Sequence, residues 1–172
     1  MAKDPVPGLA GILNDGRQYV LDSVAGLDDS QARRKPAPER WSVLECMEHI
    51  ATVEDRFLGW ILNGREGGGP ERSWERQTKL FSMVTDRSTK VQAPEAVVPT
   101  GRFASLEEAI DAFTTARART IDLHEKFGQD LYQIGATHPR FGDVNGADVM
   151  HLIAGHARRH ADQIRETREA LG

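Results

Sequence analysis

Apolar residues recur every three or four positions over four long stretches of this chain, and this periodicity is what most constrains its fold. In an α-helix each residue advances about 100°, so this spacing gathers apolar side chains on one face. We predict long helices over residues 9–27, 42–62, 105–127 and 147–171, and a short helix over residues 74–84. No alternating strand pattern of comparable strength is present in the sequence.

Capping signals mark the start of two of these helices. Ser42 and Glu45 form an S-x-x-E pattern, in which each side chain satisfies a free backbone N–H of the first turn. Ser105 and Glu108 repeat the pattern before the third long helix. The second helix is expected to stop at the Asn-Gly pair of residues 63–64, which favours a turn.

The segments between the predicted helices contain helix-breaking residues. Residues 64–70 are rich in glycine and are expected to form a loop, as are residues 138–146. Prolines in residues 93–101 favour an extended or irregular backbone. The simplest arrangement is one all-α domain over residues 1–172, an antiparallel four-helix bundle with a long connection between helices two and three.

Composition excludes several classes of protein. The formal net charge of -4 and the pI near 5.9, without a basic stripe, argue against nucleic-acid binding. No apolar run reaches the roughly 18 residues of a membrane span, and the N-terminal residues lack the apolar core of a secretion signal. A single cysteine, Cys46, excludes an intramolecular disulfide, so a reducing cytoplasm is the expected location.

The histidines of the predicted helix over residues 147–171 differ in helical phase. With His156 set at zero, His160 falls at about 40° and Gln163 near -20°, all within the apolar stripe. His151 falls near 220°, on the face expected to meet solvent. The sequence therefore predicts two buried imidazoles one turn apart on the last helix.

Two imidazoles at positions i and i+4 of one face can converge on a single cation. The alternative is a pair of core histidines, His156 and His160, that are satisfied by hydrogen bonds. A metal site needs a further ligand, and His49 lies at one edge of the apolar arc of the second helix. Taken alone His49 would be a surface or interfacial residue, but beside the pair it is the best third ligand.

Two motifs carry a resemblance to a known family. Residues 41–50 read W-S-V-L-E-C-M-E-H-I, a W-[ST] pair followed by a histidine and an aliphatic residue. Residues 138–142 read H-P-R-F-G, and residues 155–164 read G-H-A-R-R-H-A-D-Q-I. Together they resemble the DinB-like superfamily of four-helix metalloproteins, and the resemblance extends over nearly the whole chain.

The resemblance implies a function and a ligand set. Proteins of this family usually bind a divalent metal through one histidine of helix two and two of helix four, which match His49, His156 and His160. Characterised relatives include mycothiol-dependent maleylpyruvate isomerase and bacillithiol transferases, and many others have no known reaction. The family often forms homodimers, so the resemblance implies a homodimer here.

Three neutral imidazoles plus water form an open site of the kind found in catalysis. A metal ion held in this way can polarise an oxygen or lower the pKa of a bound water or thiol. Zn or Ni is the favoured metal, with Fe or Mn as alternatives. We therefore expect a metal-dependent thiol transferase or hydrolase acting on a small molecule. The alternative is a non-catalytic metal- or ligand-binding stress-response protein, because no acid–base pair accompanies the histidines.

Two further residues are candidates for supporting catalysis. Gln163 shares the face of the last two histidines and can hold an imidazole or a bound water, or it is simply an interfacial polar residue. Glu54 lies in the apolar arc of the second helix, where a carboxylate needs a partner. It can orient a histidine, act as a base or pair with a buried arginine such as Arg117, which can alternatively bind a substrate carboxylate.

For the remaining candidate residues we expect a structural role first. Cys46 lies on the apolar arc and is expected to pack rather than to act as a nucleophile. His124 is expected to be a packed or capping residue, with a fourth metal ligand as the alternative. His138 precedes a proline and is expected to serve a turn. The tryptophans are expected to be core or interface anchors: Trp41, Trp60 and Trp74.

Overall fold

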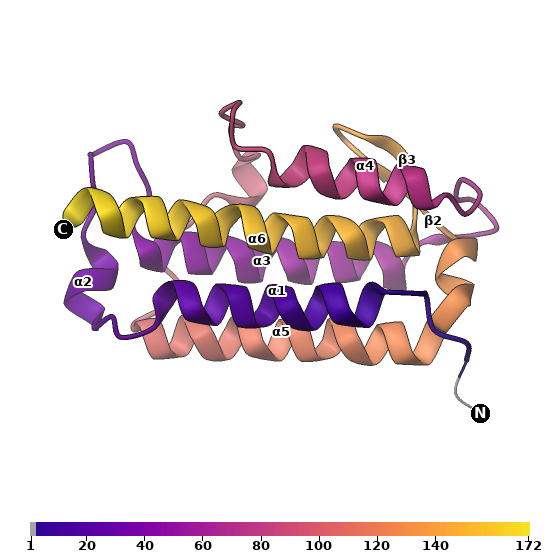
Figure 1. Ribbon diagram of the computed structural model, residues 1–172, viewed down its shortest axis with the longest axis horizontal. Helices are drawn as coiled ribbons and strands as arrows, with labels where there is room; N and C mark the ends of the chain where they lie inside the picture. Colours follow the sequence, from indigo (N-terminus) through magenta and orange to yellow (C-terminus); the bar gives the residue numbers. More distant parts are fainter. Residues whose placement is uncertain (1–2) are drawn as a thin grey trace.

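The computed structural model describes residues 3–172, and it is built mainly of α-helices (Figure 1). The predicted four-helix bundle is confirmed, and it consists of α1 (Leu9–Val24), α3 (Val43–Leu62), α5 (Leu106–Phe127) and α6 (Gly146–Leu171). No helix in residues 3–172 is long and apolar enough to cross a membrane. The other helical elements are α2 (Asp29–Arg33), α4 (Trp74–Thr85) and the 3-10 turns η1 (Glu95–Val97) and η2 (Gly128–Gln133).

The helix α1 lies beside α6 and runs in the same direction. The Tyr19 hydroxyl donates a hydrogen bond to Asp162 (2.6 Å), and further along both helices the Arg168 guanidinium donates to the Ser23 carbonyl (2.8 Å). Both helices run from right to left in Figure 1. The expectation of a uniformly antiparallel bundle is therefore wrong for this pair.

The same correction applies to α3 and α5, which both run from left to right in Figure 1. Arg119 lies 3.5 Å from Asp55, and further along the two helices Leu62 and Leu123 line one shallow surface groove. The pairs α1–α5 and α3–α6 are antiparallel. Parallel neighbours arise because residues 63–105, between α3 and α5, return the chain to the end where α3 began, whereas a short loop forces antiparallel packing.

A small antiparallel sheet closes one end of the bundle, where loops were predicted. It has the order β1 (Arg65–Glu66), β2 (Ile134–His138) and β3 (Gly142–Asn145). In the register of the sheet, Gly135 of β2 pairs with both Arg65 and Asn145. Strands of two to five residues are too short to show an alternating pattern, so they could not be predicted from the sequence.

The hydrogen bonds at the helix N-termini match the predicted capping box at α3 and differ from it in part at α5. The Glu45 N–H donates to Ser42 Oγ (3.2 Å) and the Ser42 N–H donates to the Glu45 carboxylate (2.7 Å), which confirms the predicted capping box. At α5 the Glu108 N–H donates to Ser105 Oγ (3.1 Å), but the Glu108 carboxylate accepts from Ala104 instead (2.7 Å). The Glu108 side chain therefore bonds the N–H of the residue before the N-cap, and not that of Ser105 itself.

Buried apolar side chains form two clusters along the bundle, and a buried polar layer lies between them. This layer contains Glu54 and Arg117, which are 2% and 0% exposed. One cluster includes Leu9, Leu13, Phe57, Leu131, Val149 and Ile153. The other includes Val20, Met47, Ile50, Phe113, Ala157 and Ile164.

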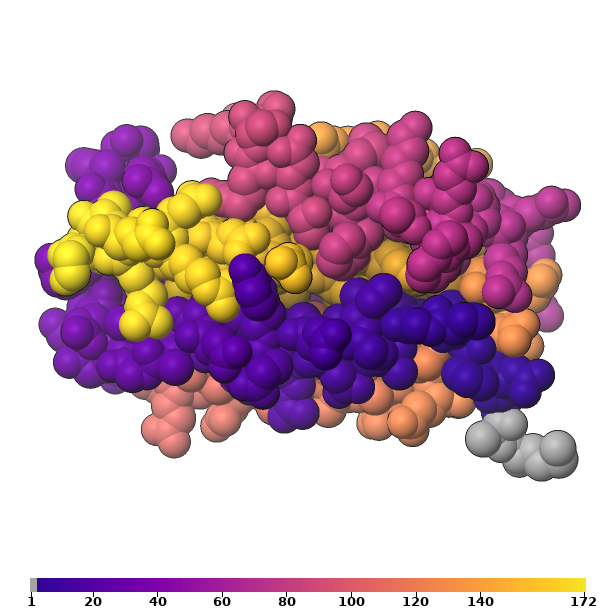
Figure 2. Space-filling view, in the orientation of Figure 1, coloured from indigo at the N-terminus to yellow at the C-terminus, as the bar shows by residue number. Residues whose placement is uncertain are grey.

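The helix α4 covers a face of α6 that a four-helix bundle would leave in solvent (Figures 1 and 2). His151 was predicted to lie on this solvent face, and that prediction is wrong, because the residue is 2% exposed beneath α4. Its Nδ1–H donates to the Ala147 carbonyl (2.8 Å). Gly155 lets α4 approach, since a Cβ there would lie 3.3 Å from the Phe81 ring. Trp74 is 61% exposed, so it is not a core residue.

The buried His151 leads to a prediction about pH. Burial lowers the pKa of His151 below its ordinary value in the folded protein. In the unfolded chain the imidazole takes up a proton as the pH falls through about 6.5, which the folded state resists, so stability falls with pH below that value. Urea unfolding of metal-free protein at pH 7.5 and 5.0 is expected to show this loss. The loss should be smaller in His151→Leu, and equal losses in the two proteins would contradict the prediction.

Candidate metal centre

Three histidines from two helices converge inside the bundle. His49 comes from the second turn of α3, and His156 and His160 come from successive turns of α6, which packs antiparallel against α3. Their potential ligand atoms all lie within 4.8 Å of one another. The Nε2 atoms of His49 and His156 are 3.0 Å apart. The i, i+4 spacing that predicted the α6 pair thus places both rings opposite His49.

Two of the three imidazoles are held in one tautomer by oxygen acceptors. The Nδ1–H of His49 donates to the Val97 carbonyl (2.7 Å), and the Nδ1–H of His160 donates to Gln163 Oε1 (2.8 Å). A neutral imidazole with its proton on Nδ1 has a lone pair on Nε2. Gln163 was a candidate from the sequence, whereas the Val97 carbonyl was missed, because any residue type offers a backbone oxygen.

The surroundings keep the imidazoles neutral. Burial lowers the pKa of His49, and the hydrogen bond to Val97 only partly opposes this effect. Burial, with a further contribution from the neighbouring histidines, lowers the pKa values of His156 and His160 well below the ordinary value. Metal binding requires deprotonated imidazoles, so the site is ready to accept a cation at neutral pH without first losing protons.

Aromatic rings wall the site, and one histidine opens to solvent. The Trp41 ring centroid lies 4.8 Å from that of His49 and 6.1 Å from that of His160. The Phe57 ring lies 6.4 Å from His156 on another side. His49 and His160 are buried, whereas His156 is half-buried. His156 is therefore the most exposed residue of the three.

The donor set fits a divalent metal. Two nitrogens bound to one zinc ion at about 2.0–2.1 Å lie roughly 3.3 Å apart in tetrahedral geometry, close to the 3.0 Å between His49 and His156. The convergent set contains three imidazoles and no carboxylate or thiolate. Imidazole ligands suit Zn, Ni, Cu and Fe. Three protein ligands would leave a further position for water or substrate.

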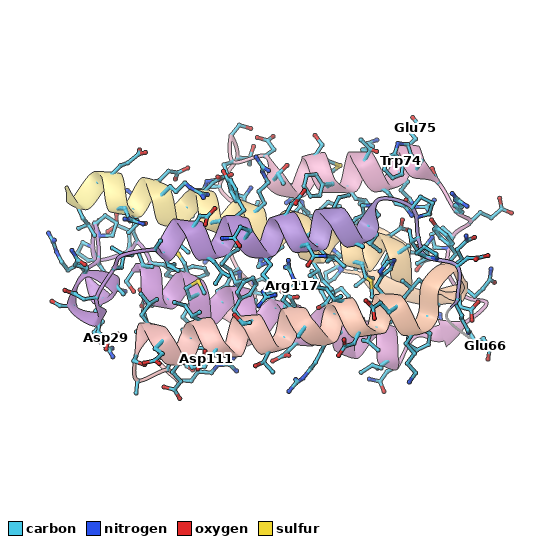
Figure 3. All side chains as sticks on the ribbon, turned by 60° about the horizontal axis from the view of Figure 1, so that its bottom comes forward. Asp29, Glu66, Trp74, Glu75, Asp111 and Arg117 are labelled. Atoms are coloured by element: carbon cyan, nitrogen blue, oxygen red, sulfur yellow. The ribbon has the colours of Figure 1, made fainter. Side chains whose placement is uncertain are left out.

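Glu54 and Arg117 form a buried ion pair within the polar layer. Arg117, which α5 contributes, is labelled in Figure 3. The Arg117 guanidinium donates to both carboxylate oxygens of Glu54 (2.6 and 3.0 Å) and to the Leu13 carbonyl (2.7 Å). Thr120 donates a further hydrogen bond to Glu54 (2.7 Å). This geometry supports the structural interpretation of Glu54 rather than that of a catalytic base. Arg117 is fully buried and has no surface for a substrate carboxylate.

The other candidates occupy structural positions. His124 Nε2 accepts a hydrogen bond from the Val6 N–H (3.2 Å), which ties the N-terminal segment to α5. Burial raises the pKa of the Cys46 thiol to about 12, so it is a packed and unreactive group. His138 Nδ1 accepts from the Arg140 N–H (3.0 Å) within the β2–β3 turn.

The contact between Gln163 and His160 predicts a graded effect on metal binding. Gln163→Ala removes the acceptor that orients His160, and loss of such an outer partner typically lowers metal affinity about 10–100-fold. Gln163→Glu keeps an acceptor oxygen and is expected to retain most of the affinity. Zinc titration against a competing chelator measures both variants, and unchanged affinity in Gln163→Ala would contradict the prediction.

Comparison with known proteins gives matches over nearly the whole chain. Residues 12–164 match the family model of the DinB superfamily. The chain is similar to the uncharacterized protein YuaE of Bacillus subtilis (strain 168), with 24% identity over 160 residues, which cover 93% of this chain and 97% of YuaE.

Two solved structures share the fold. TT2238, described as a four-helix bundle protein, has a TM-score of 0.59 and 18% identity, and the match covers 92% of this chain and 96% of that chain. YfiT from Bacillus subtilis has a TM-score of 0.60 and 15% identity, and the match covers 95% of this chain and 86% of that chain. YfiT is described as "a probable metal-dependent hydrolase with an unusual four-helix bundle topology". At these identities the likeness shows the fold alone.

Proposed function

The chain belongs to the DinB superfamily, and on that premise we propose that it is a metal-dependent enzyme with one divalent ion held by His49, His156 and His160. The three histidines form a group that could bind a metal. The description of YfiT as "a probable metal-dependent hydrolase", on the same fold, adds support for enzymatic activity.

The observation that carries the proposal is the joint orientation of the three rings. The Nδ1 protons of His49 and His160 are engaged by oxygen atoms outside the cluster, so their Nε2 atoms carry the lone pairs, and Nε2 of His49 lies 3.0 Å from Nε2 of His156. His156 is the one member of the cluster that is partly exposed, so we propose that a small solute reaches the metal from its side. A divalent ion bound there would act as a Lewis acid that lowers the pKa of a bound water or thiol.

The protein residues around the ion would have defined tasks. The Val97 carbonyl and the Gln163 side chain keep the Nδ1 protons of His49 and His160 in place, so both rings remain neutral donors. Trp41 lies against two of the rings and excludes water from that side, so a substrate would approach at His156.

We propose a small molecule as the substrate, with water or a low-molecular-weight thiol as the attacking group. Zn or Ni is the proposed metal, and Fe or Mn are alternatives. The proposed reaction class is accordingly hydrolysis or thiol transfer. We also propose that the protein forms a homodimer.

An activity screen with matched variants tests the proposal. Metal-free protein would be reconstituted with Zn²⁺ or Ni²⁺ and assayed for hydrolysis of ester and amide substrates. It would also be assayed for thiol consumption with 1-chloro-2,4-dinitrobenzene as electrophile. We expect metal-dependent turnover in the wild type and in His124→Ala, and its loss in His160→Ala. Stoichiometric metal binding without turnover in any assay would favour the non-catalytic alternative.

A further inference from the structure

Glu48 precedes the metal-ligand candidate His49 on α3, and the residue is 3% exposed. It accepts four hydrogen bonds from one short segment. The donors are the N–H of Thr100 (2.6 Å), Gly101 (3.0 Å) and Arg102 (3.2 Å) and the Thr100 hydroxyl (3.2 Å). Within residues 3–172 no lysine or arginine side chain forms an ion pair with Glu48, so backbone amides are its main partners.

The backbone of this segment is shaped for the carboxylate. Gly101 has a φ of +81°, in the left-handed region that residues with a side chain rarely adopt. A residue in this conformation allows successive N–H groups to point to one side and to surround an anion. Glu48 occupies that concavity and therefore holds residues 100–102 against α3.

Both neighbours, Glu48 and His49, contact the same stretch of chain. His49 donates to the Val97 carbonyl, three residues before the segment that Glu48 holds. Successive helical residues point about 100° apart, so the two side chains fix the stretch at two separate points. The position of the Val97 carbonyl thus depends on the anchorage of residues 100–102.

The connection that contains this stretch is also fixed on the other helix of the site. Arg159 of α6 donates to the Thr89 carbonyl (3.1 Å). Arg87 donates two hydrogen bonds to Glu166 of α6 (2.8 and 2.5 Å). Residues 87–102 therefore pass from α6 to α3, the two helices that carry the three histidines.

We propose that Glu48 is a positioning residue for the three-histidine site, which it serves by holding residues 97–102 so that the Val97 carbonyl orients His49. The metal-related part of this inference rests on the proposed function. Glutamine cannot replace Glu48 in this role, because its amide nitrogen is a donor and would face backbone N–H groups that are also donors. We therefore expect Glu48→Gln to lower the affinity for the metal although all three histidine ligands are retained.

The test uses Glu48→Gln in metal-free and zinc-loaded full-length protein. In the metal-free protein we expect amide exchange at residues 100–102 to rise by at least about 10-fold, since the native-state opening of a segment follows its local stability. The His49 imidazole should lose its preference for the Nδ1–H tautomer, which its ¹⁵N NMR shifts report. Zinc affinity, measured against a chelator, should fall about 10–100-fold.

Two further variants make the result decisive. Glu45→Gln makes the same chemical change on the same helix, but its carboxylate caps Ser42 and does not contact residues 97–102; all three readouts should stay near wild type. Gly101→Ala strains the backbone of residues 100–102 while it leaves Glu48 in place, and it should reproduce the effects of Glu48→Gln. It also provides the test if Glu48→Gln does not fold.

Unchanged exchange at residues 100–102 and an unchanged His49 tautomer in Glu48→Gln, with Gly101→Ala also at wild-type values, would overturn the inference. A wild type that binds no metal would instead overturn the proposed function. The exchange and tautomer measurements on metal-free protein would then still decide the role of Glu48.

Discussion

Replacing Arg117 by alanine is expected to lower the free energy of unfolding by roughly 3–5 kcal/mol, because removal of one partner leaves a buried charge uncompensated. Arg117 and Glu54 are 0% and 2% exposed and share two hydrogen bonds. The variant also removes the donor to the Leu13 carbonyl. Urea denaturation followed by circular dichroism gives the free energy directly.

Two comparisons separate this effect from a simple loss of side-chain volume. The double variant Arg117→Met/Glu54→Leu removes both charges, and it should be much closer to wild type, since apolar replacement of a buried pair is often neutral. Arg119→Ala breaks the exposed pair with Asp55 and should cost no more than about 1 kcal/mol. If Arg117→Ala were no more costly than Arg119→Ala, the pair of Arg117 and Glu54 would not stabilise the fold.

Replacing His49 by alanine is expected to lower the affinity for a divalent ion by about 100-fold or more. Structural zinc sites with four ligands bind with about 10–16 kcal/mol, so one ligand contributes roughly 3 kcal/mol. The variant removes one of three nitrogen donors and leaves His156 and His160 on α6. Zinc or nickel titration against a chromophoric chelator measures the affinity.

The matched control for His49→Ala is His124→Ala. His124 is equally buried, at 2% against 3% exposed, but its Nε2 accepts from the Val6 N–H and it lies outside the convergent set. Its removal should leave metal affinity unchanged while it lowers stability. Equal losses of affinity in the two variants would mean that His49 acts through stability rather than as a ligand.

The candidate site was predictable where it depends on helix geometry. His156 and His160 share a face because they are one turn apart on one helix, and that relation is local in the sequence. His49 lies on another helix, so its place opposite the pair depended on how α3 and α6 pack. The sequence supplied this third residue through its position at the edge of an apolar arc and through the family resemblance.

Other features depend on tertiary contacts that periodicity does not encode. His151 was predicted to lie in solvent because helical phase does not show where the short helix predicted over residues 74–84 packs, and this helix, α4, covers that face. The parallel pairing of α1 with α6 follows from the path of residues 63–105 rather than from any helix sequence. Glu48 was missed because its partners are backbone amides of an irregular segment, and such donors leave no mark in the sequence.

The central claim is that His49, His156 and His160 bind one divalent ion, and metal analysis tests it most directly. The protein would be purified without a histidine tag and its bound metals quantified by inductively coupled plasma mass spectrometry, beside the double variant His156→Ala/His160→Ala. We predict about one equivalent of metal in the wild type and almost none in the folded double variant, as expected for a single three-histidine site. Absence of metal from the wild type, even after reconstitution with zinc and nickel, would contradict the claim.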